Sequence, residues 1–176
     1  MEFIDVYDRY RNKVRKAERE EVLGEGEYRL VVHICVFNGK NQMLVQKRQP
    51  FKKGWSGLWD LSTGGTAQSG ETSAQAACRE LKEEIGIDFD FSKERPFASV
   101  SYTAGFDDYY LIEKETDPDD LKLQYEEVEK VRWADKCEIL SMIDSGEFIP
   151  YHKGFIEMLF DMRNDFGTII GDQRLN

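Results

Sequence analysis

Three glutamates with helical spacing are the residues of this chain best suited to chemistry. Glu80, Glu83 and Glu84 are spaced i, i+3 and i+4, so a helix would carry all three on one side. Such acids usually form a solvated acidic surface, but here they flank an apolar stripe and follow a glycine-rich loop. Carboxylate oxygens that converge beside such a loop are the ligands that a hard divalent cation such as Mg²⁺ prefers. The three glutamates are therefore candidate metal ligands.

The segment that carries these acids is predicted to be a helix from Thr72 to Ile85. Thr72 is followed three residues later by Gln75, which fits a capping box, and Gly86 stands where a C-terminal cap is expected. The alanines, the leucine, the lysine and the glutamates between them are strong helix formers. The apolar stripe, which we expect to face the core, consists of Ala74, Ala77, Cys78, Leu81 and Ile85.

Composition limits the classes of function that this chain can have. Its 176 residues, 40% hydrophobic and 33% charged, suit one sizeable soluble domain. No apolar run approaches the length of a membrane span, and the start of the chain has no apolar core of a signal peptide. The net charge of −10 argues against a nucleic-acid partner but not against a phosphorylated small molecule. Three widely spaced cysteines without a CxxC pair indicate reduced thiols and a cytoplasmic location.

Strands are expected around the acidic helix, because short β-branched and aromatic runs alternate with turn residues. These predicted strands are residues 2–7, 28–37, 43–48, 97–103, 106–113 and 128–134. Residues 8–22, which hold a basic run, are predicted to be a solvated turn and short helix. Two further helices are expected at 137–145 and 151–164, the second with an apolar stripe of Phe155, Met158, Leu159 and Met162. Together these elements predict an α+β fold, with a mixed β-sheet sandwiched between helices.

Trp55 and Trp59 follow the second predicted strand, and both are expected to pack their loop onto the sheet. His33 lies inside the first long strand, where a lone histidine is more often a packed residue than a ligand.

The stretch from Gly65 to Ile87, GTAQSGETSAQAACRELKEEIGI, resembles the Nudix box at every fixed position. The matching positions are Gly65, Glu71, Arg79-Glu80-Leu81, Glu83-Glu84 and Gly86-Ile87. This pattern of constrained positions is far more specific than a lone glycine motif. Box and element order together extend the resemblance over about residues 28–163. It implies the Nudix fold, an α/β/α sandwich, in a single domain over residues 1–176.

The resemblance implies a Mg²⁺- or Mn²⁺-dependent hydrolase. Such an enzyme cleaves a diphosphate linkage, in a nucleoside diphosphate derivative or similar small molecule, by attack of water on phosphorus. Carried over by position, the metal ligands are the backbone carbonyl of Gly65 and the carboxylates of Glu80, Glu83 and Glu84. Glu71 would support the site through a hydrogen bond or bridging contact, and Arg79 would orient the carboxylates.

The resemblance does not identify the general base, because members of the family differ in this residue. Some members use a glutamate of the box, and others use a glutamate in a later loop, shortly before a strand that contains tryptophan. Here Glu127 stands at that spacing before Trp133, with Glu126 next to it, and a solvated acidic loop is an equal alternative. Asp107 and Asp108 are weaker candidates.

A finer resemblance links FNGKNQMLVQKR and KKGWSGLW to the isopentenyl-diphosphate isomerase branch of the same superfamily. By analogy with that branch, the residues that bind the substrate's diphosphate would be Lys47, Arg48 and Lys53. The isomerases rely on a cysteine just before the box glycine and on metal-binding histidines. This chain has Gly64 and Thr66 at the corresponding positions, whereas its box is intact. The resemblance therefore favours a hydrolase; an isomerase or a non-catalytic nucleotide-binding module is the alternative, and a homodimer stays open.

Overall fold

The computed structural model describes residues 2–164, 167, 169 and 170. Seven strands form the main sheet: β3 (Arg29–Phe37), β4 (Gln42–Arg48), β5 (Trp59–Asp60), β6 (Thr63–Thr66), β7 (Ala98–Tyr102), β8 (Gly105–Glu113) and β9 (Val128–Asp135). A separate hairpin is formed by β1 (Phe3–Tyr7) and β2 (Lys13–Glu18). The helices are α1 (Ser73–Ile85), α2 (Lys136–Ser145) and α3 (Lys153–Asp161), with short 3-10 turns η1 (Phe91–Lys93) and η2 (Pro118–Asp120).

The main sheet is mixed, because β3 pairs in parallel with β8 and antiparallel with β6. The strand order is β5-β4-β3-β8-β7, with β6 also on β3 and β9 also on β4. β3 pairs with β4 only at Phe37 and Met43, after which β4 continues along β9. This divergence leaves β6, which carries the first glycine of the box, beside the middle of β3.

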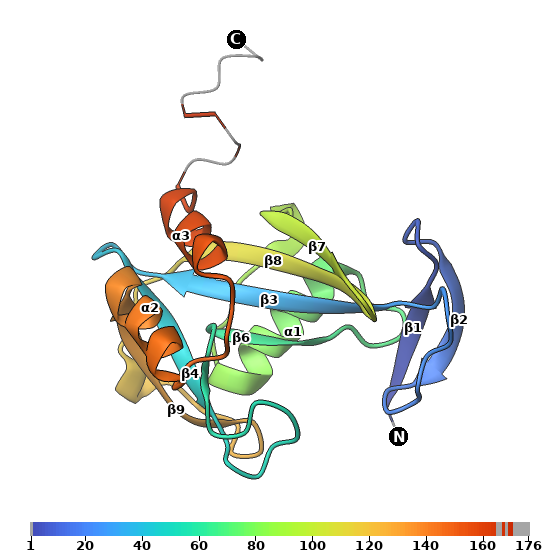
Figure 1. Ribbon diagram of the computed structural model, residues 1–176, viewed down its shortest axis with the longest axis horizontal. Coiled ribbons are helices and arrows are strands. Elements are labelled where there is room, and N and C mark those ends of the chain that lie inside the picture. Colours follow the sequence, from blue (N-terminus) through green and yellow to red (C-terminus); the bar gives the residue numbers. More distant parts are fainter. Residues whose placement is uncertain (1, 165–166, 168, 171–176) are drawn as a thin grey trace.

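Helices cover both faces of the sheet (Figure 1). Successive side chains of β3 point to opposite faces, so Val32 and Ile34 pack with Leu81 of α1 in one buried cluster. Cys35 and Phe37 belong to a second buried cluster that includes residues of α2 and α3. The α+β sandwich predicted from the sequence is therefore confirmed. Among the described residues, no helix is both long and apolar enough to cross a membrane.

The box helix α1 confirms its predicted caps. The side chain of Thr72 accepts a hydrogen bond from the backbone N–H of Gln75, and the Gln75 side chain accepts one from the backbone N–H of Thr72. Gly86 ends the helix in the left-handed region, at a φ of 75° that favours glycine. The buried side of the helix is more acidic than the predicted stripe, since Glu80 and Glu84 lie on it.

The prediction for residues 8–22 is wrong, because the centre of that segment is strand β2. Ile4, Val6 and Ala17 form a small buried cluster between the two strands of the hairpin. The long basic side chains lie outside it, where Arg15 contacts Glu27. Cross-strand pairing and ion pairs thus outweigh the local sequence pattern, as is common for strands.

The prediction for the last helix is correct in type but wrong in its start and packed side. Trp59 exchanges backbone hydrogen bonds with Glu147 and Ile149, which keeps the chain extended and delays the helix to Lys153. The residues of α3 that pack inward are Ile156, Leu159 and Phe160.

The prediction that Trp55 packs its loop onto the sheet is also wrong. Its side chain is 54% exposed. It lies in a turn where Gly54, Trp55 and Gly57 all have positive φ angles. Trp55 is therefore mostly exposed, whereas Trp59 is partly buried against the second core cluster.

Candidate functional site

A cavity of about 570 Å³ lies where α1, β6, the loop before β5 and the end of the hairpin meet. Its acidic residues on the box are Glu80, Glu83 and Glu84, next to the backbone of Gly64 and Gly65. Its basic residues are Arg19, Arg48, Lys52 and Arg79. The cavity therefore combines groups that attract a cation with groups that attract an anion.

Arg79 is the centre of the acidic side of this cavity. Its Nε and Nη2 donate to the two carboxylate oxygens of Glu71 at 2.7 and 3.0 Å. Its Nη1 donates to Glu80 at 2.8 Å and to Glu83 at 3.1 Å, and Nη2 also reaches the carbonyl of Thr66 at 3.2 Å. One planar guanidinium thus connects three box glutamates to the end of β6, as a forked donor can.

Glu84 is the most deeply buried acid of the box, with 4% of its surface exposed. Thr63 Oγ1, Gln46 Nε2 (3.2 Å) and the Gly64 amide (3.4 Å) all donate to its Oε2. Burial raises the pKa of the Glu84 carboxyl to about 8, and the hydrogen bond from Thr63 opposes that rise only in part. No ion pair joins it to a lysine or arginine of the described chain, so this buried carboxylate lacks a cation.

The carboxylate of Glu80 closely approaches the backbone at Gly65. A Cβ added to Gly65 would lie 2.2 Å from Glu80 Oε1, so any side chain here would displace the Glu80 carboxylate. Burial raises the pKa of the Glu80 carboxyl, although the charge of Arg79 acts against this shift. The backbone of the box loop and two buried carboxylates therefore share one small volume.

The donor set of this volume fits a hard divalent cation. All candidate donors are oxygens, from carboxylates and a backbone carbonyl, and Glu84 brings a buried carboxyl group whose charged form a bound cation would stabilise. Within the described residues, no three acidic, histidine or cysteine side chains converge as a metal site as they stand. The carboxylates of Glu80 and Glu83 do not converge with Glu84 because both form ion pairs with Arg79.

The four candidates for the general base divide into two groups. Glu127 and Asp107 line the cavity, whereas Glu126 and Asp108 are not among its lining residues. Glu127 forms an ion pair with Lys52, and Asp108 is held by Arg11 on the hairpin.

The structure separates the three predicted diphosphate-binding residues. Arg48 lines the cavity and lies 3.7 Å from Asp60. Lys47 points to the other side of β4, as alternation in a strand requires, and pairs with Glu129 at 3.1 Å. Lys53 is not among the lining residues either, and its neighbour Lys52 lines the cavity instead. Alternation along β4 was a signal that could have separated Lys47 from Arg48 in advance.

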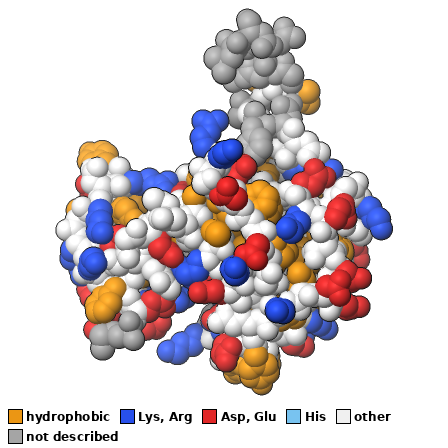
Figure 2. Space-filling view, turned by 180° about the vertical axis from the view of Figure 1, so that it is seen from behind, with side chains coloured by type: hydrophobic (Ala, Val, Ile, Leu, Met, Phe, Trp, Pro, Cys, Tyr) orange, Lys and Arg blue, Asp and Glu red, His pale blue; other side chains and the backbone are white. Residues whose placement is uncertain are grey.

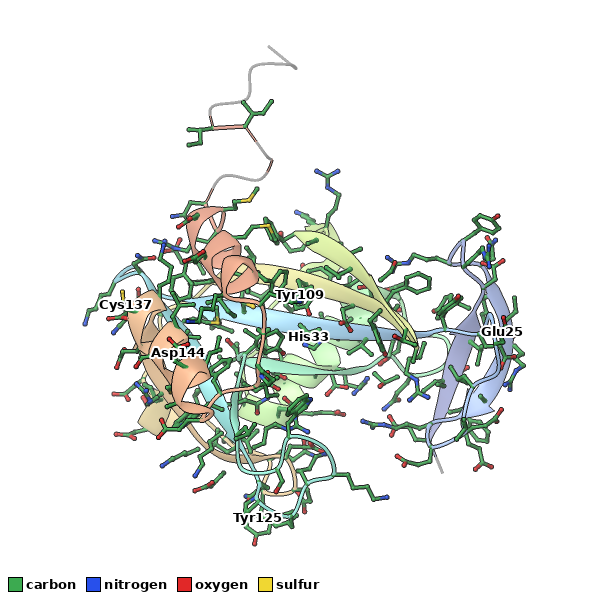
Figure 3. The ribbon with its side chains drawn as sticks, viewed as in Figure 1. Glu25, His33, Tyr109, Tyr125, Cys137 and Asp144 are labelled. Carbon is green, nitrogen blue, oxygen red and sulfur yellow. The ribbon has the colours of Figure 1, made fainter. Side chains whose placement is uncertain are left out.

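Sequence reasoning missed several lining residues, of which His33 is the most informative. His33 was expected to be a packed residue, but its ring lines the cavity and stacks on Tyr109, with centroids 4.6 Å apart. Figure 3 shows the two labelled side chains next to each other on adjacent strands. His33 Nε2 also lies 3.3 Å from Asp107 Oδ1. His33 belongs to no motif, so only the pairing of β3 with β8 could reveal its place in the cavity.

Comparison with known proteins agrees with this arrangement of box, sheet and helices. Residues 27–153 match the NUDIX domain family, and the chain therefore belongs to the Nudix family of hydrolases. An uncharacterized Nudix hydrolase of Listeria innocua is 48% identical over 165 residues, which is 93% of this chain and 96% of that protein. The crystal structure of DR0079 from Deinococcus radiodurans superposes with a TM-score of 0.73, at 22% identity, over 95% of this chain and all of that one.

The isomerase branch also appears among the relatives, at a greater distance. An isopentenyl-diphosphate Delta-isomerase of Escherichia coli is 32% identical over 117 residues, covering 62% of this chain and 63% of that enzyme. This similarity is a secondary feature of a chain whose family is the Nudix hydrolases.

Proposed function

We propose that this protein is a Mg²⁺- or Mn²⁺-dependent hydrolase that cleaves a diphosphate linkage in a nucleoside diphosphate derivative or a similar small molecule. The observation that carries the proposal is the buried carboxylate of Glu84, which lacks a cation and shares its cavity with Arg48 and Lys52. A metal ion on the acidic side and basic side chains nearby are complementary to a diphosphate.

The metal would be held by the carboxylates of Glu80, Glu83 and Glu84 and the carbonyl of Gly65. When bound, it would neutralise charge on the phosphate oxygens and make an attacking water more acidic. Arg79 holds Glu80 and Glu83 through hydrogen bonds of 2.8 and 3.1 Å. These contacts would keep both carboxylates close to the metal position before the metal binds. This is the role of a residue that orients metal ligands.

The remaining roles fall to side chains on the other elements of the cavity. Arg48 and Lys52 would bind phosphate oxygens, Arg48 through its planar fork and Lys52 as a point charge. Glu127 would accept the proton of the attacking water. Its present contact with Lys52 is compatible with that role, because a phosphate would compete for the lysine.

The isomerase alternative is disfavoured by the space around Gly64. A Cβ at this position would lie 2.7 Å from the Val32 carbonyl oxygen and 3.0 Å from His33 Nδ1. A catalytic cysteine could not stand there without a backbone shift. The three cysteines of the chain are not among the residues that line the cavity. The non-catalytic module is disfavoured because all four box glutamates are in place.

The wider setting proposed for the protein follows from the sequence. We propose one domain over residues 1–176, with a small-molecule diphosphate as its partner and neither nucleic acid nor membrane. The free thiols of Cys35, Cys78 and Cys137 support a cytoplasmic location. A homodimer stays open.

The test is hydrolysis of a panel of nucleoside diphosphate derivatives, nucleotides and isoprenoid diphosphates, measured as phosphomonoester, diphosphate or phosphate products, with Mg²⁺ or Mn²⁺ and with a chelator. We expect hydrolysis of one class that stops when the chelator is added and returns when the metal is restored. A Glu84→Gln variant, which keeps the shape and removes the charge, serves as the matched control. Saturable binding of one ligand without any turnover would favour the non-catalytic module instead.

A further inference from the structure

The N-terminal hairpin is a separate sheet that is firmly attached to the rest of the molecule (Figure 1). Tyr7 and Tyr28 exchange two backbone hydrogen bonds, of 2.8 and 2.9 Å, where the hairpin meets the start of β3. At its turn, Arg11 makes a forked contact with the buried carboxylate of Asp108, at 3.0 and 2.8 Å. Forked ion pairs of this kind fix orientation as well as distance.

A third attachment reaches the box itself. The carboxylate of Asp5, 5% exposed, accepts hydrogen bonds from Ser69 Oγ at 2.7 Å and from the Gly70 amide at 2.9 Å. Lys13, on the second strand, completes this contact at 2.7 Å from Asp5. Ser69 and Gly70 lie in the loop that leads to Glu71, so the hairpin is placed directly beside the acidic site.

Arg19, which follows the last residue of β2, extends from this hairpin to the cavity. It and Glu2 both line the cavity, and its Nη1 donates to Glu2 Oε2 at 2.6 Å. The pKa of Arg19 is raised: burial lowers it, but the contact with Glu2 and the negative charges of Glu80 and Glu127 outweigh that effect. The guanidinium therefore lies within the electrostatic field of the box acids. In the space-filling view a notch separates the hairpin from the main body, with Lys and Arg side chains beside it (Figure 2).

The other basic residues of the hairpin segment do not line the cavity. Lys13 pairs with Asp5, Arg15 pairs with Glu27 and Glu21, and Arg11 pairs with Asp108. Lys16 is exposed on the surface of the hairpin. Arg19, although it pairs with Glu2, is thus the member of the basic run that lines the cavity.

We propose that Arg19 binds phosphate oxygens of the substrate, so that the hairpin β1–β2 forms one wall of the substrate site. This inference rests on the proposed function, since it takes a diphosphate-linked molecule as the ligand. Glu2 accepts a hydrogen bond from one nitrogen of the Arg19 guanidinium, and a guanidinium has five N–H donors in a fork that matches a phosphate. Arg48 and Lys52 come from a different element, so the cavity would hold the phosphates between two independent sets of cations.

The experiment compares Arg19→Ala and Arg19→Lys with Lys16→Ala. The last variant removes the same charge from the same hairpin but from a residue outside the cavity. Steady-state hydrolysis is measured on the substrate that the panel identifies, and binding of inorganic diphosphate with Mg²⁺ is measured by calorimetry. Thermal unfolding of each variant confirms that the hairpin remains folded.

For Arg19→Ala we expect a KM about 10- to 100-fold higher, the effect of losing charged hydrogen bonds, with a much smaller change in kcat. Arg19→Lys should recover part of this loss, because it keeps the charge without the fork. Lys16→Ala should match the wild type. An unchanged KM and diphosphate affinity in Arg19→Ala, or equal losses in Arg19→Ala and Lys16→Ala, would overturn the inference. If the wild type hydrolyses nothing, the proposed function fails, and the calorimetric comparison of the same variants still decides the role of Arg19.

Discussion

Replacement of Arg79 by lysine should damage both the stability and the activity of this protein. The guanidinium makes five hydrogen bonds, to Glu71, Glu80, Glu83 and the carbonyl of Thr66. A lysine ammonium keeps the charge, but it has three donors and no planar fork. It cannot hold both oxygens of Glu71 and still reach the acids of the helix.

The size of the effect follows from these contacts. Loss of at least two charged hydrogen bonds would cost about 1.5–3 kcal/mol each if they were fully buried. Arg79 is 16% exposed but Glu83 is 52% exposed, so solvent screens part of this energy. We expect a net loss of about 2–3 kcal/mol in the free energy of unfolding. For a chain of this length this corresponds to a decrease in Tm of about 5–10 °C.

The rate should fall as well, because the candidate ligands Glu80 and Glu83 lose their common anchor. A displacement of about 1 Å at such a site costs about 100-fold in rate. The assay is thermal unfolding together with kcat for metal-dependent hydrolysis. The matched control is Arg9→Lys, at an exposed position of the hairpin turn, and it should change stability by less than about 0.5 kcal/mol. Wild-type Tm and kcat in Arg79→Lys would refute the role assigned to this residue.

Further predictions concern the acids of the site and the hairpin contact. Glu83→Gln and Glu84→Gln should each reduce kcat by orders of magnitude with the fold intact by circular dichroism, and near-wild-type rates in both would contradict the proposed metal site. Glu127→Gln should slow hydrolysis without weakening Mg²⁺ activation, and unchanged activity would place the base elsewhere. The pKa of Asp108 is lowered: burial raises it, but hydrogen bonds from Arg11 and Ser99 outweigh burial. Its contribution is therefore present above the unfolded-state pKa of about 4 and is lost as the pH falls through the lower folded-state value. In pH-dependent unfolding, Asp108→Asn should accordingly be less stable than the wild type at neutral pH by an amount that shrinks in acid; a constant difference would contradict this.

The features that the sequence predicted correctly are those encoded by near neighbours. The caps of α1 lie at Thr72 and Gly86, and each is satisfied by residues within a few positions. The long strands β3 and β8 are dense β-branched and aromatic runs, and they lie where the pattern predicts them. The spacing of the box acids predicted Glu80, Glu83 and Glu84 on one side of a helix, and in the structure Glu80 and Glu84 lie on its buried side while Glu83 is 52% exposed.

The features that were missed depend on residues far apart in the chain. The local sequence of β2 is typical of a charged helix, but the segment is a strand because it pairs with β1. The turn before it is held by the ion pair of Arg11 with Asp108, 97 positions later in the chain. The same packing brings Arg19 to the cavity.

The basic loop and the central strands show the same limit. Lys52 and Lys53 are adjacent lysines that the sequence pattern does not distinguish. The conformation of the turn around Gly54 decides which of the two lines the cavity. His33 enters the cavity through the register of β3 with β6 and β8. The sequence by itself determined where the helix begins and ends and which acids it carries, because both follow from local spacing. Only the tertiary structure decided which cations and rings face it, because those positions are set by strand pairing and by long-range ion pairs.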